Sequence, residues 1–203
     1  MQDYMSEIQR VINPLIYAIN RHDKLNNLEY FIGGEIIVDA AISWSEFNTV
    51  TIFLADISKG DIFYKILKDL GYVQIEQTDY TRRFKNLNNV INVMHFKSFT
   101  AKECIINAEL LVEGFVIDNS FTLFYHREFF EDINSRTINV IHLHEPSSGI
   151  EHRIQKLKDR GFKMSKPGQK VLSAYKRGVD YKKMLKPILP EEIITKQTMS
   201  WTI

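Results

Sequence analysis

The sequence contains a single cysteine, Cys104, among its 203 residues. One cysteine excludes an internal disulfide framework and a zinc site built from clustered cysteines, and it fits a reducing compartment. The first residues contain neither a basic region nor an apolar stretch, so no secretory signal is visible. No apolar run approaches the roughly 18 residues that a membrane-spanning helix needs. We therefore expect a soluble, cytoplasmic protein with no membrane partner.

Acidic residues are scarce near the C-terminal end of the chain. Residues 153–186 contain twelve Lys or Arg and two acids, Asp159 and Asp180, so this segment has a net charge of +10. The remaining 14 basic and 23 acidic residues give the rest of the chain a net charge of −9. Such an asymmetry indicates an acidic partner, or pairing with the protein's own acidic body in the same chain or in a second copy.

The first alternative predicts a partner that is either a nucleic acid or an acidic protein surface. The basic residues expected to bind it are Arg153, Lys156, Arg160, Lys163, Lys166, Lys170, Lys176, Arg177, Lys182 and Lys183. The second alternative predicts a homo-oligomer or a C-terminal helix docked tightly on its own chain.

Hydrophobic residues make up 44% of the chain and aromatic residues 12%, so a packed core is expected. Apolar spacing predicts a helix over 4–21, in which Pro14 should cause a kink or a break. Capping boxes are expected at Thr100 with Glu103 and at Ser148 with Glu151. Further helices are expected at 35–42, 61–70, 101–111, 149–160 and 171–178, and strands at 28–32, 49–54, 72–76, 90–96, 115–117, 121–125 and 138–143.

This alternation of helices and strands is typical of an α/β (α+β) protein. Proline and basic residues become frequent after Pro146. We therefore expect a core at 1–146 and a basic helical C-terminal segment at 147–203 that packs on it.

A Gly-Gly pair and two polar positions on the following strand are the most informative motif. The apolar strand Tyr30-Phe31-Ile32 ends in Gly33-Gly34, and Thr49 and Thr51 alternate on the strand 49–54. This arrangement resembles nucleotidyltransferase-fold proteins, in particular degenerate ones of the kind predicted in large DNA viruses and phages. The resemblance covers roughly 28–162, extends to the segments 108–120 and 158–162, and implies a mixed sheet flanked by helices.

In active members of this family, the resemblance implies that the glycine pair and the following helix hold a triphosphate through backbone N–H groups. Two aspartates on one strand and a carboxylate on a neighbouring strand bind two magnesium ions, which align the reacting groups. Here both aspartate positions hold threonine, the strand 90–96 offers an asparagine but no acid, and an anion follows the glycines. Neutral side chains cannot offset two divalent cations, so we expect no catalytic residue, no metal and no cofactor. The degenerate nucleotide site would consist of Gly33, Gly34, Glu35, Thr49, Thr51 and Asn92.

The favoured hypothesis is a catalytically silent nucleotidyltransferase-like binding protein, acting as a regulatory or anti-defence factor of a virus or phage in the host cytoplasm. One alternative is an active nucleotidyltransferase on RNA or protein that recruits Asp39 or Asp56. Another is a nucleic-acid-binding module without nucleotide chemistry. A third is an unrelated α/β domain, in which Gly33-Gly34 is an ordinary strand-to-helix turn.

Two other constellations could carry chemistry. His142, His144, Glu145 and His152 could hold a metal, but no partner stands at diagnostic spacing, so a polar strand edge is the favoured interpretation. Cys104 with His95 or His126 could form a thiol nucleophile. A cysteine between apolar residues in a helix usually behaves as a small buried hydrophobe, and we favour that interpretation.

Overall fold

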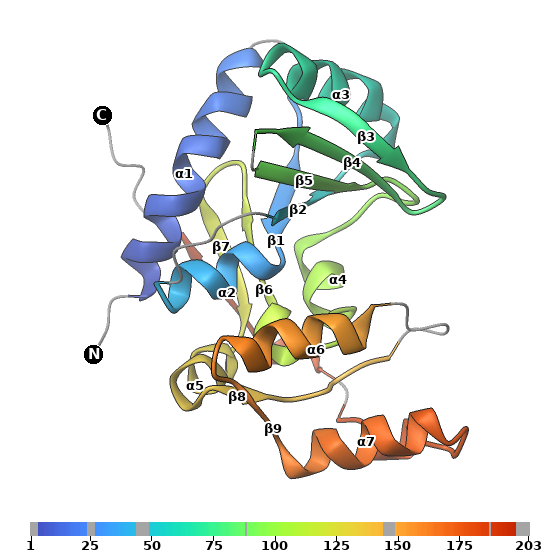
Figure 1. The fold of residues 1–203 in the computed structure, drawn as a ribbon. Helices are drawn as coiled ribbons and strands as arrows, with labels where there is room; N and C mark the ends of the chain where they lie inside the picture. The colour runs from blue at the N-terminus through green and yellow to red at the C-terminus, as the bar shows by residue number, and fades with distance from the viewer. Residues whose placement is uncertain are drawn as a thin grey trace.

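The computed structural model describes residues 4–23, 27–43, 49–87, 89–143, 149–186 and 188–197. Eight strands form one mixed sheet in the order β10-β7-β6-β1-β2-β5-β4-β3, and the short strands β8 and β9 pair separately (Figure 1). The strands are β1 (Tyr30–Gly33), β2 (Thr49–Leu54), β3 (Val73–Gln77), β4 (Thr81–Asn86), β5 (Asn89–Met94), β6 (Phe115–Asp118), β7 (Thr122–His126), β8 (Thr137–Ile138), β9 (Lys163–Met164) and β10 (Ile193–Gln197). The helices are α1 (Tyr4–His22), α2 (Glu35–Ala41), α3 (Gly60–Asp69), α4 (Ala101–Ile106), α5 (Phe129–Ser135), α6 (Ile150–Asp159) and α7 (Lys166–Lys176).

The large sheet separates two apolar clusters, because alternate residues of a strand point to opposite faces. On β2, Ile52 packs in the larger cluster with α1, α2 and α3, whereas Phe53 packs against the smaller one. The smaller cluster is built around Cys104 and Ile105 of α4, which contacts β6 and β7. Helices therefore cover both faces of the sheet.

Helix α1 continues through Pro14, so of the predicted kink or break the break is wrong. Ile8, Ile12, Ile16 and Ile19 form a fully buried stripe along it. Pro14 lies on the exposed side, where the carbonyl that loses its N–H partner can bind water. Burial of the isoleucine stripe offsets the missing hydrogen bond.

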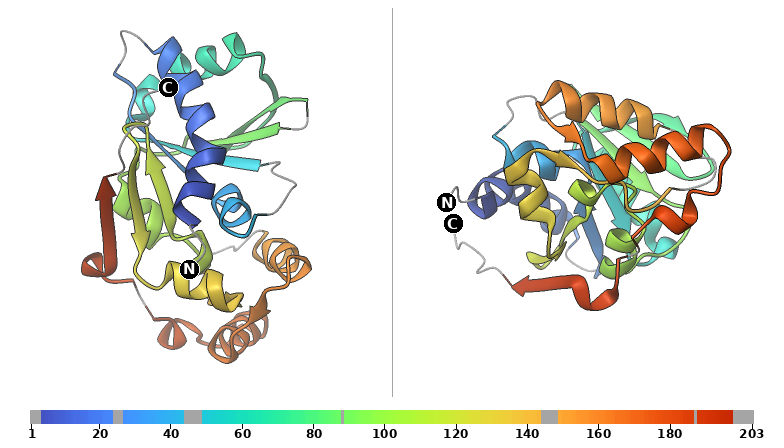
Figure 2. Two further views of the ribbon diagram at one scale, coloured as in Figure 1. Left: turned by 90° about the vertical axis from the view of Figure 1, so that its left-hand side faces the viewer. Right: turned by 90° about the horizontal axis from the view of Figure 1, so that it is seen from below.

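The C-terminal part of the chain is less helical than expected. Strand β10 pairs antiparallel with β7 and extends the large sheet, and Figure 2 shows the two side by side. The strand expected at 138–143 is wrong: residues 137–138 form β8, which pairs with β9, and Val140 makes an isolated bridge with Leu110. Residue patterns also missed β4 and α5, which are short and contain few apolar residues in alternation.

The capping box of Thr100 and Glu103 is confirmed at the start of α4. Ser148, the first residue of the other predicted capping box, lies outside the described residues. The N-cap of α6 is Gly149. The boundary expected near 146 also falls outside them. No helix in the described ranges is long and apolar enough to cross a bilayer.

Candidate functional site

The Gly-Gly turn joins β1 to α2 in a conformation that needs glycine. Gly34 has a φ of 83°, and a Cβ there would lie 2.7 Å from the Thr51 Oγ1. A Cβ on Gly33 would lie 2.9 Å from a methyl carbon of Val116 and 3.0 Å from the Phe115 carbonyl oxygen. The turn is thus closely packed against β2 and β6, and α2 begins directly after it.

Three neutral side chains of the predicted site come from neighbouring strands. Thr51 lies opposite Gly33 on β1 and opposite Asn92 on β5, which runs parallel to β2. Thr49 shares a face of β2 with Thr51, because the two are two residues apart. All three polar side chains are half-buried. The structure thus places Thr51 beside Gly33, Gly34 and Asn92, with Thr49 on the same face of β2.

A cation, Arg83 of β4, occupies the edge of this group. Its Nε donates to the Asn92 Oδ1 at 3.0 Å, and its Nη1 lies 2.8 Å from the Glu76 Oε2. Asn92 is the residue at the position where the family resemblance implies a third carboxylate. Arg83 was not among the predicted site residues, because β4 carries little apolar alternation that would reveal it as a strand.

The acid that follows the glycines is paired within the chain. The Lys156 Nζ of α6 lies 3.1 Å from both carboxylate oxygens of Glu35. Arg160, one turn further along α6, contacts Asp39 of α2 through Nε at 2.7 Å and Nη2 at 2.9 Å. Arg160 also lies 3.8 Å from Glu35. The side chains of Lys156 and Arg160 therefore neutralise the two acids of α2, the helix that lies beside α6 in Figure 1.

Burial raises the pKa of Asp39 to about 6, although Arg160 opposes this shift. Arg153, at the start of the same face of α6, donates to Glu113 at 2.7 Å and also binds Glu109. Burial likewise raises the pKa of Glu113, with Arg153 opposing. Arg153, Lys156 and Arg160 thus form a stripe of ion pairs with the body of the protein.

Asp56 is a helix cap. Its Oδ1 accepts hydrogen bonds from the Ser58 side chain at 2.7 Å and from the Ser58 N–H at 2.9 Å. These bonds lower the pKa of the carboxyl group. Asp56 follows the end of β2 and is exposed, so neither Asp39 nor Asp56 lies free on the face that carries Thr49 and Thr51.

The other predicted cations lie on and around α7. Lys163, Lys166, Lys170, Lys176, Arg177, Lys182 and Lys183 are all exposed. Lys176 pairs with Glu151 at 2.8 Å, and Lys183 pairs with Asp180 at 3.6 Å, both on the surface. The ten predicted cations therefore divide into a stripe facing the body and a set facing solvent.

The thiol and metal constellations find little support. Cys104 is buried, which raises the pKa of its thiol far above the usual range. Within the described ranges, no three His, Cys, Asp or Glu side chains are grouped to hold a metal. His144 and Glu145 lie outside those ranges.

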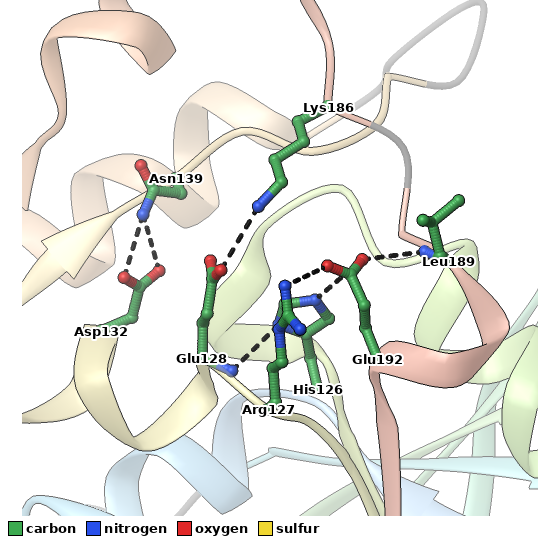
Figure 3. Close-up of polar contacts among 8 residues, drawn as sticks. All are labelled: His126, Arg127, Glu128, Asp132, Asn139, Lys186, Leu189 and Glu192. Atoms are coloured by element: carbon green, nitrogen blue, oxygen red, sulfur yellow. Dashed lines mark hydrogen bonds and ion pairs between the residues drawn. The ribbon is translucent and has the colours of Figure 1, made fainter.

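A buried polar cluster that the sequence analysis missed holds β10 against β7 (Figure 3). The Glu192 carboxylate accepts a hydrogen bond from the Leu189 N–H at 2.9 Å and pairs with the Arg127 Nη2 at 2.8 Å. The His126 Nδ1 accepts from the Glu128 N–H, so a neutral ring carries its proton on Nε2, 3.6 Å from Glu192. Burial lowers the pKa of His126, which favours this neutral form, against the opposing effect of Glu128 and Glu192.

The neighbouring contacts in Figure 3 are also internal. Both carboxylate oxygens of Asp132 accept from the Asn139 amide, at 2.9 and 3.0 Å, and Lys186 donates to Glu128 at 3.3 Å. Burial raises the pKa of Asp132 to about 7. The polar atoms of these groups are hydrogen-bonded to one another. The cluster therefore attaches the C-terminal strand β10 to the rest of the protein.

Comparison with solved structures identifies the fold. A CCA-adding enzyme in complex with CTP matches with a TM-score of 0.61 and 14% identity, over 87% of this chain and 47% of that chain. A tRNA nucleotidyltransferase complexed with a primer tRNA and an incoming ATP analogue matches with a TM-score of 0.58 and 19% identity, over 79% of this chain and 50% of that chain. The chain has a nucleotidyltransferase-like fold.

The Thermotoga maritima CCA-adding enzyme complexed with tRNA also matches, with a TM-score of 0.58 and 12% identity. That match covers 94% of this chain and 52% of the enzyme, so the chain spans about half the length of these neighbours. No protein-family model and no curated protein matches the sequence. The fold class expected from the Gly-Gly and Thr-x-Thr pattern is confirmed.

Proposed function

We propose that this protein is a catalytically silent member of the nucleotidyltransferase fold that binds RNA. The observation that carries the proposal is the set of residues at the strand positions next to the glycine turn. Thr49, Thr51 and Asn92 are neutral, and Arg83 donates to Asn92. A cation and three neutral groups do not make a site for two magnesium ions, which require several oxygen ligands with negative charge.

The nearby acids do not compensate for this loss. Glu35 and Asp39 are held by Lys156 and Arg160, and Asp56 caps the turn after β2. Recruiting Asp39 as a metal ligand would break a pair in which both side chains are at most 11% exposed. Freeing a buried charge in this way is costly, so we do not favour an active enzyme with rearranged carboxylates.

The proposal of RNA as the partner has two supports. Two structural neighbours are complexes with tRNA. The exposed cations around α7 form a basic surface that is separate from the stripe engaged with the body, and such surfaces bind phosphates. A regulatory or anti-defence role for a virus or phage is the wider setting that we propose for this binding.

The test of silence is a transfer assay. We expect no label to pass from any of the four α-labelled nucleoside triphosphates to tRNA or to the protein, with magnesium or manganese present. Calorimetry with the same magnesium-nucleotides should give no heat of micromolar binding. An active CCA-adding enzyme is the positive control, and transfer above background by this chain would overturn the proposal of silence.

The test of binding is fluorescence anisotropy with a labelled tRNA transcript. If three to five phosphates are neutralised, the affinity should fall about 20- to 100-fold when salt rises from about 50 to about 200 mM. Polyglutamate of similar length serves as the acidic-protein competitor. Binding of polyglutamate with equal affinity, or no binding of RNA at low salt, would refute RNA as the partner.

A further inference from the structure

A pocket of about 650 Å³ lies between α6, β9 and α7, away from the degenerate site. Three lysines line it, Lys158, Lys163 and Lys176, together with the polar side chains of Gln169 and Ser173. No acidic residue is among the residues that line it. Its volume lies within the range of about 300–1,000 Å³ that is usual for small-molecule sites.

Helix α6 has basic side chains on two faces. One face contacts the acids of α2, and the other lines the pocket. A helix turns by about 100° per residue, so Lys158 points about 200° away from both Lys156 and Arg160. Lys156 and Arg160 face Glu35 and Asp39, whereas Lys158 faces the pocket. The charge of Lys158 therefore remains available to a ligand.

All three pocket lysines are available to bind a ligand. Lys158 and Lys163 are exposed and make no ion pair within the described part of the chain. Lys176 pairs with Glu151, but the side chains are 51% and 64% exposed. A surface pair that is this exposed contributes little to stability, so a phosphate can replace Glu151 at little cost.

One part of the pocket wall is apolar. Phe162 is 2% exposed, and the Arg136 guanidinium lies 5.3 Å from its ring centre, while Met164 and Leu172 are half-buried beside it. An apolar wall next to a cationic rim suits a ligand that has a planar ring and a phosphate. An acidic peptide would use the lysines but would leave the apolar wall without a partner.

We propose that the α6–α7 pocket binds one nucleotide unit, with its phosphate at the lysines and its base against Met164 and Leu172. The inference rests on the proposed function in that we favour an RNA chain as the source of this nucleotide. A free nucleotide has the same chemistry and is the second source to be tested. The residues of the degenerate site beside Gly34 take no part in this binding.

The experiment compares two charge-reversed variants that have the same net charge. Lys158→Glu with Lys163→Glu removes two pocket lysines, whereas Lys166→Glu with Lys170→Glu removes two cations of α7 that do not line the pocket. A third variant, Ser173→Trp, fills the pocket from an exposed position without changing charge. Thermal melts should confirm that all three are folded.

The probe is a fluorescein-labelled 12-nucleotide single-stranded RNA. We expect the pocket double variant to lose at least about tenfold in affinity and the control double variant only about two- to threefold, because both lose general phosphate attraction but only one loses the site. Ser173→Trp should lose at least about fivefold, the scale of one stacked base. Displacement of the RNA by millimolar AMP identifies free nucleotide as a second source, and no displacement identifies the RNA chain alone.

If the two double variants lose RNA affinity equally and Ser173→Trp keeps the affinity of the parent protein, the pocket is not the nucleotide site. The proposal that the protein binds RNA would still stand. If the unmodified protein does not bind RNA at low salt, the proposed function itself is refuted. The two failures are therefore distinguishable.

Discussion

At the scale of single residues, the positions beside the glycine turn combine close packing with neutral side chains. Gly34 packs against Thr51 of β2, and Thr49, Thr51 and Asn92 carry no charge. Thr51 contributes to shape, since its hydroxyl occupies the space that a Cβ on Gly34 would need.

Gly34→Val should destabilise the protein by about 1–3 kcal/mol, the scale of forcing a residue into a sparsely populated backbone region. The added clash with Thr51 should raise this cost above that of Gly178→Val, where φ is also positive but no atom lies within 4 Å of a Cβ. Urea unfolding of the two variants measures the difference. Equal losses would show that backbone conformation alone, and not the approach of β2, selects glycine at this position.

At the scale of elements, α6 is held by charge as well as by its buried apolar residues. Its stripe of Arg153, Lys156 and Arg160 satisfies acids from α2 and from the segment before β6. The charge asymmetry of the chain is thus partly neutralised internally, as the second sequence-based alternative predicted.

Arg160→Glu should destabilise the protein by about 3–5 kcal/mol, because it leaves Asp39 buried without its partner and adds a like charge beside it. The matched reversal Lys166→Glu, at an exposed position on α7, should change stability by less than about 0.5 kcal/mol. Thermal and urea unfolding of both variants test this. A neutral result for Arg160→Glu would mean that the α6 stripe is available to a partner.

Strand β10 depends on one buried carboxylate. Glu192→Ala removes the cap of Leu189 and the partner of Arg127, so the amides of 193–197 should exchange with solvent at least about tenfold faster. Glu191→Ala, at the exposed neighbouring position, is the control and should leave exchange unchanged. Hydrogen exchange followed by mass spectrometry measures both, and unchanged protection in Glu192→Ala would show that ladder hydrogen bonds alone hold β10.

At the scale of the whole molecule, the glycine turn and the exposed cations around α7 lie on different parts of the chain. The sheet, the glycine turn and the helices around them form a nucleotidyltransferase-like body. The set of exposed cations on and around α7 lies apart from the strand positions beside the glycine turn. This separation is why we assign binding to the basic surface.

Restoring both acids should restore a cation site if the geometry has been kept. The variant Thr49→Asp with Thr51→Asp places two carboxylates on one face of β2, where their repulsion should lower the melting temperature without metal. Magnesium at about 10 mM should then raise it by several degrees, through binding to the folded state alone. The parent protein should show no such shift, and neither should a variant with aspartates at the exposed positions Val73 and Ile75. No magnesium effect in the restored variant would show that the β2 positions no longer lie where a metal could bind.

The sequence by itself determined the elements that rest on local patterns. The isoleucine stripe of α1, the alternation of β2 and the capping box of α4 need only neighbours along the chain, and all three are confirmed. The family resemblance also pointed to the strand 90–96, and the structure places Asn92 of that strand beside Thr51 of β2.

Only the tertiary structure decided where the charges go. Lys156 and Glu35 are 121 residues apart, and their pairing depends on how α6 packs beside α2. The contacts of Arg83 with Asn92 and of Glu192 with His126 likewise depend on tertiary structure. Strands β4 and β10 have weak local patterns, and they are held by pairing with β5 and β7. An isolated charge in a sequence has no preferred partner, and the packing of apolar surfaces brings its partner within reach.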